Sequence, residues 1–317
     1  MEKWRLSLAG LLATALLTGC GIGGTDEEAV RKKNEAANQP TEAGAPTLTN
    51  NNATDGFNWI NYRRKQVGVA VLARNSQIDT AAQGHSDYQR VNNTITHEQT
   101  AGKTGYTGAR LTDRLTAAGY NLTGTSYAAG EVISATTNTT GFYQSEELIT
   151  AIYHRYVMFD PAFRDMGVGS ATVSGGYTYF TADFGVTGSY NSLGRGQLVT
   201  YPVNSQTGVP VNFYSDTEAP DPVPNQNLVG YPISVHADTY GSTSGTVVVQ
   251  SFTVTPRGGA ALSTRLLSYD AGNNNNVTSA ASIIPLAPLA ASTTYDVSFS
   301  GTVGGVAVTR NWSFTTK

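Results

Sequence analysis

One stretch shows how the middle of the chain folds: residues 145–169, SEELITAIYHRYVMFDPAFRDMGVG. Apolar side chains recur in it at three- and four-residue steps as far as Tyr156, which is the period of a helix that buries one face. Asp160 and Pro161 end that helix, because the residue before a proline disfavours helical backbone. The Met-Gly-Val-Gly run after them predicts a strand.

Similar signals continue on both sides, from residue 54 to residue 188. Three earlier helices are predicted: one capped by Asp55, one over residues 77–91, and a short one that ends at Gly119. A second strand, residues 177–184, follows a Gly-Gly turn. Helices followed by strands predict a sheet flanked by helices over residues 54–188.

The second half of the chain has a different pattern. Five prolines lie between residues 202 and 224, and they exclude a helix there. Beyond them polar and apolar side chains alternate, most clearly in residues 294–301, as in a strand with one wet face. We therefore expect a Pro-rich linker with the first strands over residues 189–225 and an all-β domain over residues 226–317.

The first twenty residues predict export. Lys3 and Arg5 precede an apolar run that is too short to span a bilayer, which takes about 20 apolar residues. The run ends in Leu-Thr-Gly-Cys at residues 17–20, which resembles the lipobox of bacterial lipoproteins; an ordinary secretory signal is the alternative. The lipobox implies that residues 1–20 are a signal, that Cys20 is acylated, and that the exported protein is anchored to a membrane of the cell envelope.

Composition narrows the function classes further. Residues 21–53 are polar with almost no large apolar side chains, so they predict a disordered tether. Cys20 is the only cysteine, which excludes an internal disulfide and a cysteine-based metal site. The net charge is -3 and only 14% of residues are charged, so a nucleic-acid partner has no electrostatic basis.

Histidine supplies the most informative pattern. Three of the four histidines, His85, His97 and His154, lie in residues 54–188. Imidazole is both the commonest metal ligand and the natural acid–base group near neutral pH. His85 lies on the apolar face of its helix, where a core role is favoured over a ligand role. His236 lies in the second half, and we expect it at the surface or in a turn.

Three carboxylates accompany these histidines. Glu98 adjoins His97. Glu147 precedes His154 by seven residues, about two helical turns, so the two side chains are expected on nearly the same helix face. Glu131 borders an apolar strand, where a carboxylate is costly unless it is paired.

A series of short motifs runs through this region in a fixed order: Asn-Tyr-Arg-Arg at 61–64, Ala-Ala-Gln-Gly-His-Ser at 81–86, Thr-His at 96–97, Asp-Arg-Leu at 113–115 with Gly-Tyr at 119–120, Gly-Glu-Val-Ile at 130–133, Tyr-His-Arg at 153–155, Met-Gly-Val-Gly at 166–169 and Ala-Asp-Phe-Gly at 182–185. The series resembles the bacterial, SCP-like branch of the cysteine-rich secretory protein, antigen 5 and pathogenesis-related-one (CAP) superfamily. The resemblance implies an α/β/α sandwich with a central cleft, in which histidines and glutamates can hold a divalent metal, often zinc.

The resemblance assigns the cleft residues one by one. His97 matches the histidine after the second helix, Glu131 the glutamate of the Gly-Glu-Asn motif, and His154 the histidine of the His-Arg motif. These three would form a His₂Glu zinc site with an open fourth position, with His85 as a further cleft residue. Val132 stands where the family has asparagine.

The end of the chain resembles the immunoglobulin-like domains of bacterial surface proteins. The residues that carry this are Pro-Leu-Ala-Pro-Leu at 285–289, Thr-Thr-Tyr at 293–295 and Trp-Ser-Phe-Thr-Thr at 312–316. The resemblance implies an all-β immunoglobulin-like sandwich that serves as a spacer or an adhesion module.

Together these features favour a binding module: a lipid-anchored extracytoplasmic protein whose cleft holds a divalent metal, or a lipid, glycan or peptide ligand. One alternative is a zinc-dependent hydrolase of peptide or cell-envelope material, with Glu98 or Glu147 as the general base. It is less favoured, because neither glutamate can be assigned firmly. The other alternative is an adhesin-like structural protein of the cell surface.

Overall fold

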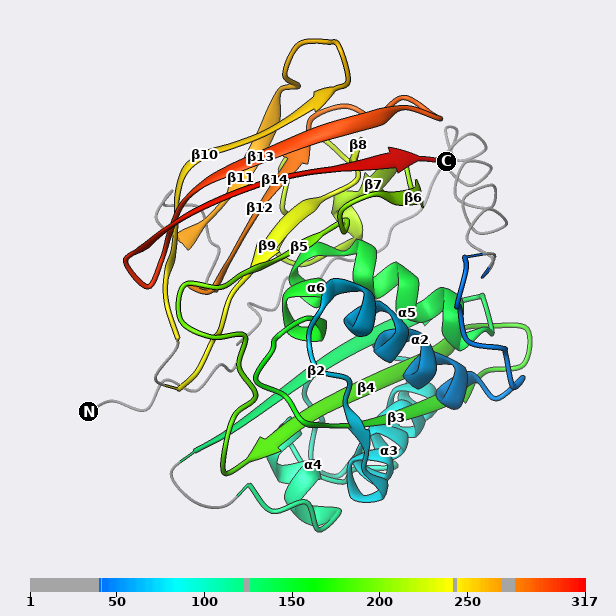
Figure 1. The fold of residues 1–317 in the computed structure, drawn as a ribbon. Helices are drawn as coiled ribbons and strands as arrows, with labels where there is room; N and C mark the ends of the chain where they lie inside the picture. The colour runs from blue at the N-terminus through cyan, green and yellow to red at the C-terminus, as the bar shows by residue number, and fades with distance from the viewer. Residues whose placement is uncertain (1–39, 41, 123–125, 242–243, 270–276) are drawn as a thin grey trace.

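The computed structural model describes residues 40, 42–122, 126–241, 244–269 and 277–317 (Figure 1). The predicted export signal, Cys20 and residues 21–39 of the predicted tether lie outside these residues. None of the described helices is long and apolar enough to cross a membrane. The chain forms an α/β region, residues 52–187, followed by a strand-rich region, residues 199–317.

A four-stranded sheet forms the centre of the α/β region. In sheet order its strands are β1 (Ala73–Arg74), β3 (Asp165–Thr172), β4 (Thr178–Thr187) and β2 (Tyr127–Thr136). Helices α3 (Ser76–Asn92) and α4 (Leu111–Ala117) lie on one face, and α2 (Asn52–Val67), α5 (Gly141–Thr150) and α6 (Ile152–Met158) lie on the other (Figure 1). The predicted sheet flanked by helices is therefore present.

Two glycines of β3 let helix α3 lie directly on the sheet. A Cβ atom at Gly167 would lie 2.1 Å from the amide nitrogen of Asp79, and one at Gly169 would lie 2.3 Å from that of Gln83. The Asp79 carboxylate then accepts a hydrogen bond from the Val168 amide at 2.8 Å. The Met-Gly-Val-Gly sequence thus sets the distance between the sheet and the helix that carries His85.

The prediction of one continuous helix from Ser145 to Tyr156 is wrong. Ala151 has extended backbone (ψ 120°), and it divides the segment into α5 and α6. Because the helix is interrupted between them, Glu147 and His154 do not share a helix face.

The start of the first helix also differs from the prediction. Asn51, not Asp55, is the N-cap, and its side chain accepts a hydrogen bond from the Thr54 amide. Asp55 lies in the first turn and accepts hydrogen bonds from the amide and hydroxyl of Thr49 at 2.6 and 2.7 Å. A carboxylate in the first turn is stabilised there by the helix dipole.

The last part of the predicted tether is packed against α2. Arg63, which is buried, donates to Glu42 from Nη1 at 2.6 Å and to Glu146 from Nε at 2.8 Å. Leu48 packs against the hydrophobic core. The folded part of the chain therefore begins about ten residues earlier than residue 53, the predicted end of the tether.

In its described residues the strand-rich region contains two four-stranded sheets and a two-stranded one. The first sheet has the order β10 (Val247–Pro256), β13 (Thr294–Val303), β14 (Val306–Thr316) and β6 (Gln206–Val209). The second has the order β11 (Thr264–Leu267), β12 (Ala280–Pro285), β9 (Ile233–His236) and β5 (Val199–Tyr201), and β7 (Asn212–Tyr214) pairs with β8 (Leu228–Gly230). A short 3₁₀ helix, Ser215–Thr217, follows β7.

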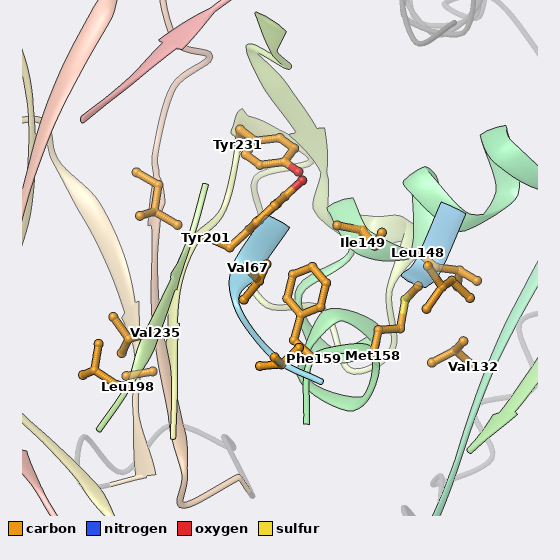
Figure 2. Close-up of a cluster of buried hydrophobic side chains, with 14 of the residues drawn as sticks. Val67, Val132, Leu148, Ile149, Met158, Phe159, Leu198, Tyr201, Tyr231 and Val235 are labelled. Atoms are coloured by element: carbon orange, nitrogen blue, oxygen red, sulfur yellow. The ribbon is translucent and has the colours of Figure 1, made fainter. Parts of the chain in front are cut away.

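One hydrophobic cluster runs through both regions. Figure 2 shows part of it, with side chains of the α/β region beside Leu198, Tyr201, Tyr231 and Val235 of the segments that follow it. The α/β side is represented there by Val67, Val132, Leu148, Ile149, Met158 and Phe159. The strand-rich region therefore shares a hydrophobic core with the α/β region.

His236 lies in this shared interior, which corrects the prediction that it is a surface or turn residue. Its side chain is buried, and Nε2 lies 2.9 Å from the Ser234 hydroxyl. The rings of Tyr156 and Phe159 contact it edge-on. Burial lowers the pKa of His236 to about 3, so the ring is neutral in the folded protein at neutral pH.

Candidate functional site

The candidate site is centred on Glu131 of β2, whose side chain is buried. Its side chain faces helices α3 and α4. Arg114 of α4 donates to Oε2 at 2.5 Å, and His97 Nδ1 lies 2.9 Å from Oε1. Arg114 also donates to the backbone oxygen of His97 at 3.0 Å, so one guanidinium holds both the carboxylate and the loop that carries the histidine.

The charge of Glu131 is set by these partners. Burial is the largest single influence and favours the neutral acid, but the Arg114 guanidinium, His85 and His97 together outweigh it and hold the pKa of Glu131 well below its ordinary value. The carboxylate is therefore ionised and can accept hydrogen bonds from both neighbours.

A second carboxyl group, Asp183, lies directly opposite Glu131 in the β2–β4 ladder. It is fully buried, and its two oxygens meet no hydrogen-bond donor. Burial, and then the nearby Glu131 charge, raise the pKa of Asp183 well above its ordinary value, which favours the protonated form.

His97 is the part of this cluster that reaches solvent. Its side chain is 51% exposed, whereas that of Glu131 is 3% exposed. Because ionised Glu131 can only accept, Nδ1 of His97 is assigned as the donor. Nε2 is left on the outer side of the ring. The arrangement presents an oriented imidazole over a buried carboxylate.

His85 lies beneath the same cluster and is satisfied internally. Its Nε2 donates to the backbone oxygen of Thr96 at 2.7 Å, and its Nδ1 accepts from Gln99 at 3.0 Å. Burial lowers the pKa of His85 to about 4. With both ring nitrogens engaged, His85 supports the His97 loop and has no nitrogen free for a ligand.

The remaining predicted site residues lie elsewhere. His154 Nδ1 is 3.0 Å from Glu218, a residue of the strand-rich region. Glu147 accepts from the Ser134 hydroxyl at 3.1 Å, and Glu98 is an exposed residue of the loop after α3. The structure thus brings together His85, His97 and Glu131 but not His154.

Comparison with known proteins agrees with this fold. Residues 57–184 match the family described as CAP, the cysteine-rich secretory protein family. These residues form a CAP domain. The resemblance to the CAP superfamily that the order of the motifs predicted is confirmed for these residues.

Solved structures with detectable similarity cover about half of the chain. One is an extracellular protein with an SCP domain from Bacillus anthracis, with 23% identity, 50% of this chain and 49% of that chain covered, and a TM-score of 0.37. Another is an outer surface protein from Borrelia burgdorferi, with 15% identity, 42% and 90% covered, and a TM-score of 0.34. No curated protein matches the sequence.

The zinc set implied by the resemblance does not fit the CAP domain as it is folded here. Both oxygens of Glu131 are engaged by Arg114 and His97, and His154 is paired with Glu218. Within the described part of the chain, no three His, Cys, Asp or Glu side chains are placed to hold a metal ion. A His₂Glu centre would require these pairs to break.

Three residues that organise the CAP domain were not singled out as site residues in the sequence. Arg114 and Asp183 lie in motifs that carry the resemblance, Asp-Arg-Leu and Ala-Asp-Phe-Gly, so a signal was present. Glu218 lies in the Pro-rich segment with no motif around it, and only the tertiary structure brings it to α6.

Glu218 caps helix α6 from outside the CAP domain. Ala151, the N-cap residue, offers no side-chain acceptor. Instead the buried Glu218 carboxylate accepts hydrogen bonds from the amides of Ile152, Tyr153 and His154 at 2.8, 2.6 and 3.1 Å. One side chain of the strand-rich region therefore completes a helix of the CAP domain.

We expect Glu218→Ala to lower the free energy of unfolding by about 2 kcal/mol, because it leaves these buried amides without an acceptor. Urea unfolding measures the loss. Hydrogen exchange followed by mass spectrometry locates it, with faster exchange in a peptide covering residues 151–158. Glu98→Ala, at an exposed position, is the matched control. Unchanged exchange at α6 in Glu218→Ala would contradict the capping role.

Proposed function

We propose that this chain is an exported, lipid-anchored binding protein of the cell envelope, and that its CAP domain recognises a polar ligand through His97. The observation that carries the proposal is the exposed imidazole of His97 held over the buried, ionised Glu131. Export and anchoring rest on the lipobox-like residues 17–20. In this proposal the strand-rich region is an immunoglobulin-like module that positions the CAP domain.

The geometry supports recognition better than hydrolysis. Glu131 fixes the orientation of the ring, so little side-chain entropy is lost when His97 binds a ligand. Nε2 can donate to a ligand when the ring is protonated and accept when it is neutral. Of the two glutamates predicted as the general base of a zinc hydrolase, Glu98 is exposed and Glu147 accepts a hydrogen bond from Ser134 of β2, so neither is among the residues that hold the His97 ring.

The ligand class that fits is a carboxylate-bearing peptide of the cell envelope. An imidazole whose ring is steadied by a carboxylate can donate a charge-assisted hydrogen bond to an anionic group. In this proposal His154, whose Nδ1 lies 3.0 Å from Glu218, has a structural role and does not contact the ligand.

The proposal is tested by titrating the full-length protein with sugar-free cell-wall stem peptides while the His97 ring signals are followed by NMR. We expect a saturable shift of these signals in the parent protein and loss of binding in His97→Ala. His154→Ala is the matched control, and its affinity is expected to stay within about twofold of the parent, less than 0.5 kcal/mol. Absence of a saturable shift, or equal losses in both variants, would overturn the proposal.

A further inference from the structure

The outer face of the first strand-rich sheet carries short polar side chains in a regular array. Thr253 of β10 lies directly opposite Ser298 of β13, and Ser298 lies directly opposite Asn311 of β14. These side chains point away from the core, because the alternate residues of the same strands, Val254 and Trp312 among them, are buried.

A second row runs beside the first, two residues along each strand. Thr255 lies opposite Asp296, and Asp296 lies opposite Ser313. We call these six residues the polar array. Neighbouring strands lie about 4.8 Å apart, so the array is a grid whose spacing is fixed by backbone hydrogen bonds.

The polar array lines a hollow of about 450 Å³. Asn204, Val297 and Trp312 complete its lining. The array itself provides four hydroxyl groups, one amide and one carboxylate, so donors and acceptors alternate over a small area. The hollow is shallow and open, and polar groups that converge on it can fix the orientation of a small polar unit.

The charge of the hollow favours a neutral ligand. Among the described residues that line it, Asp296 is the only charged one, and Arg257 donates to that carboxylate at 2.5 and 3.2 Å. Ser, Thr and Asn have few rotamers to lose, so binding to them costs little conformational entropy.

We infer that the polar array is a binding site for a neutral polysaccharide. A sugar ring carries hydroxyl groups around its edge, each a donor and an acceptor, and has no charge to neutralise. Successive residues of an extended sugar chain can meet the two rows in turn. The strand-rich region then holds its own ligand, independently of the proposed peptide site at His97.

The test uses the full-length protein in a detergent without a sugar headgroup. Sedimentation with insoluble cellulose and chitin identifies the retained polymer, and calorimetry with its soluble oligomers gives the affinity. We expect one of them to be retained. We expect the double variant Ser298→Ala, Asn311→Ala to bind the soluble oligomer at least about tenfold more weakly.

Two controls decide where the sugar binds. Thr309→Ala removes a hydroxyl from the same face of β14 outside the hollow, and His97→Ala alters the CAP domain; both are expected to retain the parent affinity. If neither cellulose nor chitin retains the protein, the polar array is only a solvent-exposed sheet surface, and the inference is overturned. Retention that the double variant leaves unchanged would overturn the assignment to the polar array.

Discussion

Replacing Arg155 by methionine is expected to lower the free energy of unfolding by about 3–5 kcal/mol. The Arg155 side chain is completely buried where the CAP domain meets the strand-rich region. It donates to the backbone oxygen of Ile149 at 2.6 Å and to that of Pro232 at 2.7 Å. Methionine fills a similar volume but leaves these carbonyl groups without a donor.

The guanidinium also lies against two aromatic rings of the strand-rich side. Its central carbon is 4.9 Å from the ring centre of Tyr201 and 5.1 Å from that of Tyr231. A cation enclosed in this way is favoured by the ring quadrupoles, and that attraction is lost in the methionine variant. The expected loss therefore combines unsatisfied carbonyls with a lost cation–π contact.

Urea unfolding of Arg155→Met measures this loss of stability, and Arg90→Met is the control. Arg90 is on the surface, and its ion pair with Asp87 is exposed, so its loss is expected to cost no more than about 0.5 kcal/mol. Equal losses in the two variants would show that Arg155 does not join the two regions.

The sequence predicts the elements of the CAP domain better than their ends. The apolar period is continuous through residues 145–156, and no glycine or proline marks the break at Ala151. The break is stable because Glu218, 67 residues further along the chain, supplies the acceptor for the freed amides. A local pattern cannot contain that information.

The site was predictable in the same partial way. The order of the motifs indicates that His97 and Glu131 converge, and the structure places them 2.9 Å apart. The order of the motifs gives no indication that Asp183 lies beside Glu131, because that pairing depends on the register of β2 and β4. His154 was assigned to the same cleft, but the strand-rich region contacts it instead.

Replacing Glu131 by glutamine is the second change for which we expect a large effect, a loss of about 3–5 kcal/mol in the free energy of unfolding at neutral pH. Arg114 is buried and would lose the carboxylate that balances its charge, keeping the backbone oxygen of His97 as an acceptor. The amide has one acceptor oxygen where the carboxylate has two, so it cannot serve Arg114 and His97 together.

Asp183→Asn is the matched control, because it changes the neighbouring carboxyl group in the same way. The folded protein favours the protonated form of Asp183, and asparagine is close to that form in shape and charge. We expect Asp183→Asn to change the free energy of unfolding by less than about 1 kcal/mol at neutral pH, or to increase it. A loss as large as that of Glu131→Gln would contradict the proposed protonation.

Asp183 and Glu131 are expected to change the free energy of unfolding in opposite directions as the pH rises. The pKa of Asp183 is raised by folding, so its contribution to stability is present below its unfolded value, about 3.9, and is lost as the pH rises through the folded pKa. The pKa of Glu131 is lowered, so its contribution is present above its unfolded value, about 4.3, and is lost as the pH falls.

Urea unfolding between pH 4 and pH 8 reads out this difference. As the pH rises, Asp183→Asn is expected to gain stability relative to the parent, because the variant has no proton to lose there. The deficit of Glu131→Gln relative to the parent is expected to stay nearly constant above about pH 5 and to shrink below it, because the parent loses its ionised Glu131–Arg114 pair only at acid pH. If the free energy of unfolding depends on pH in the same way for the parent and Asp183→Asn, Asp183 holds no proton in the folded protein. The protonation states proposed here for Asp183 and Glu131 would then be wrong.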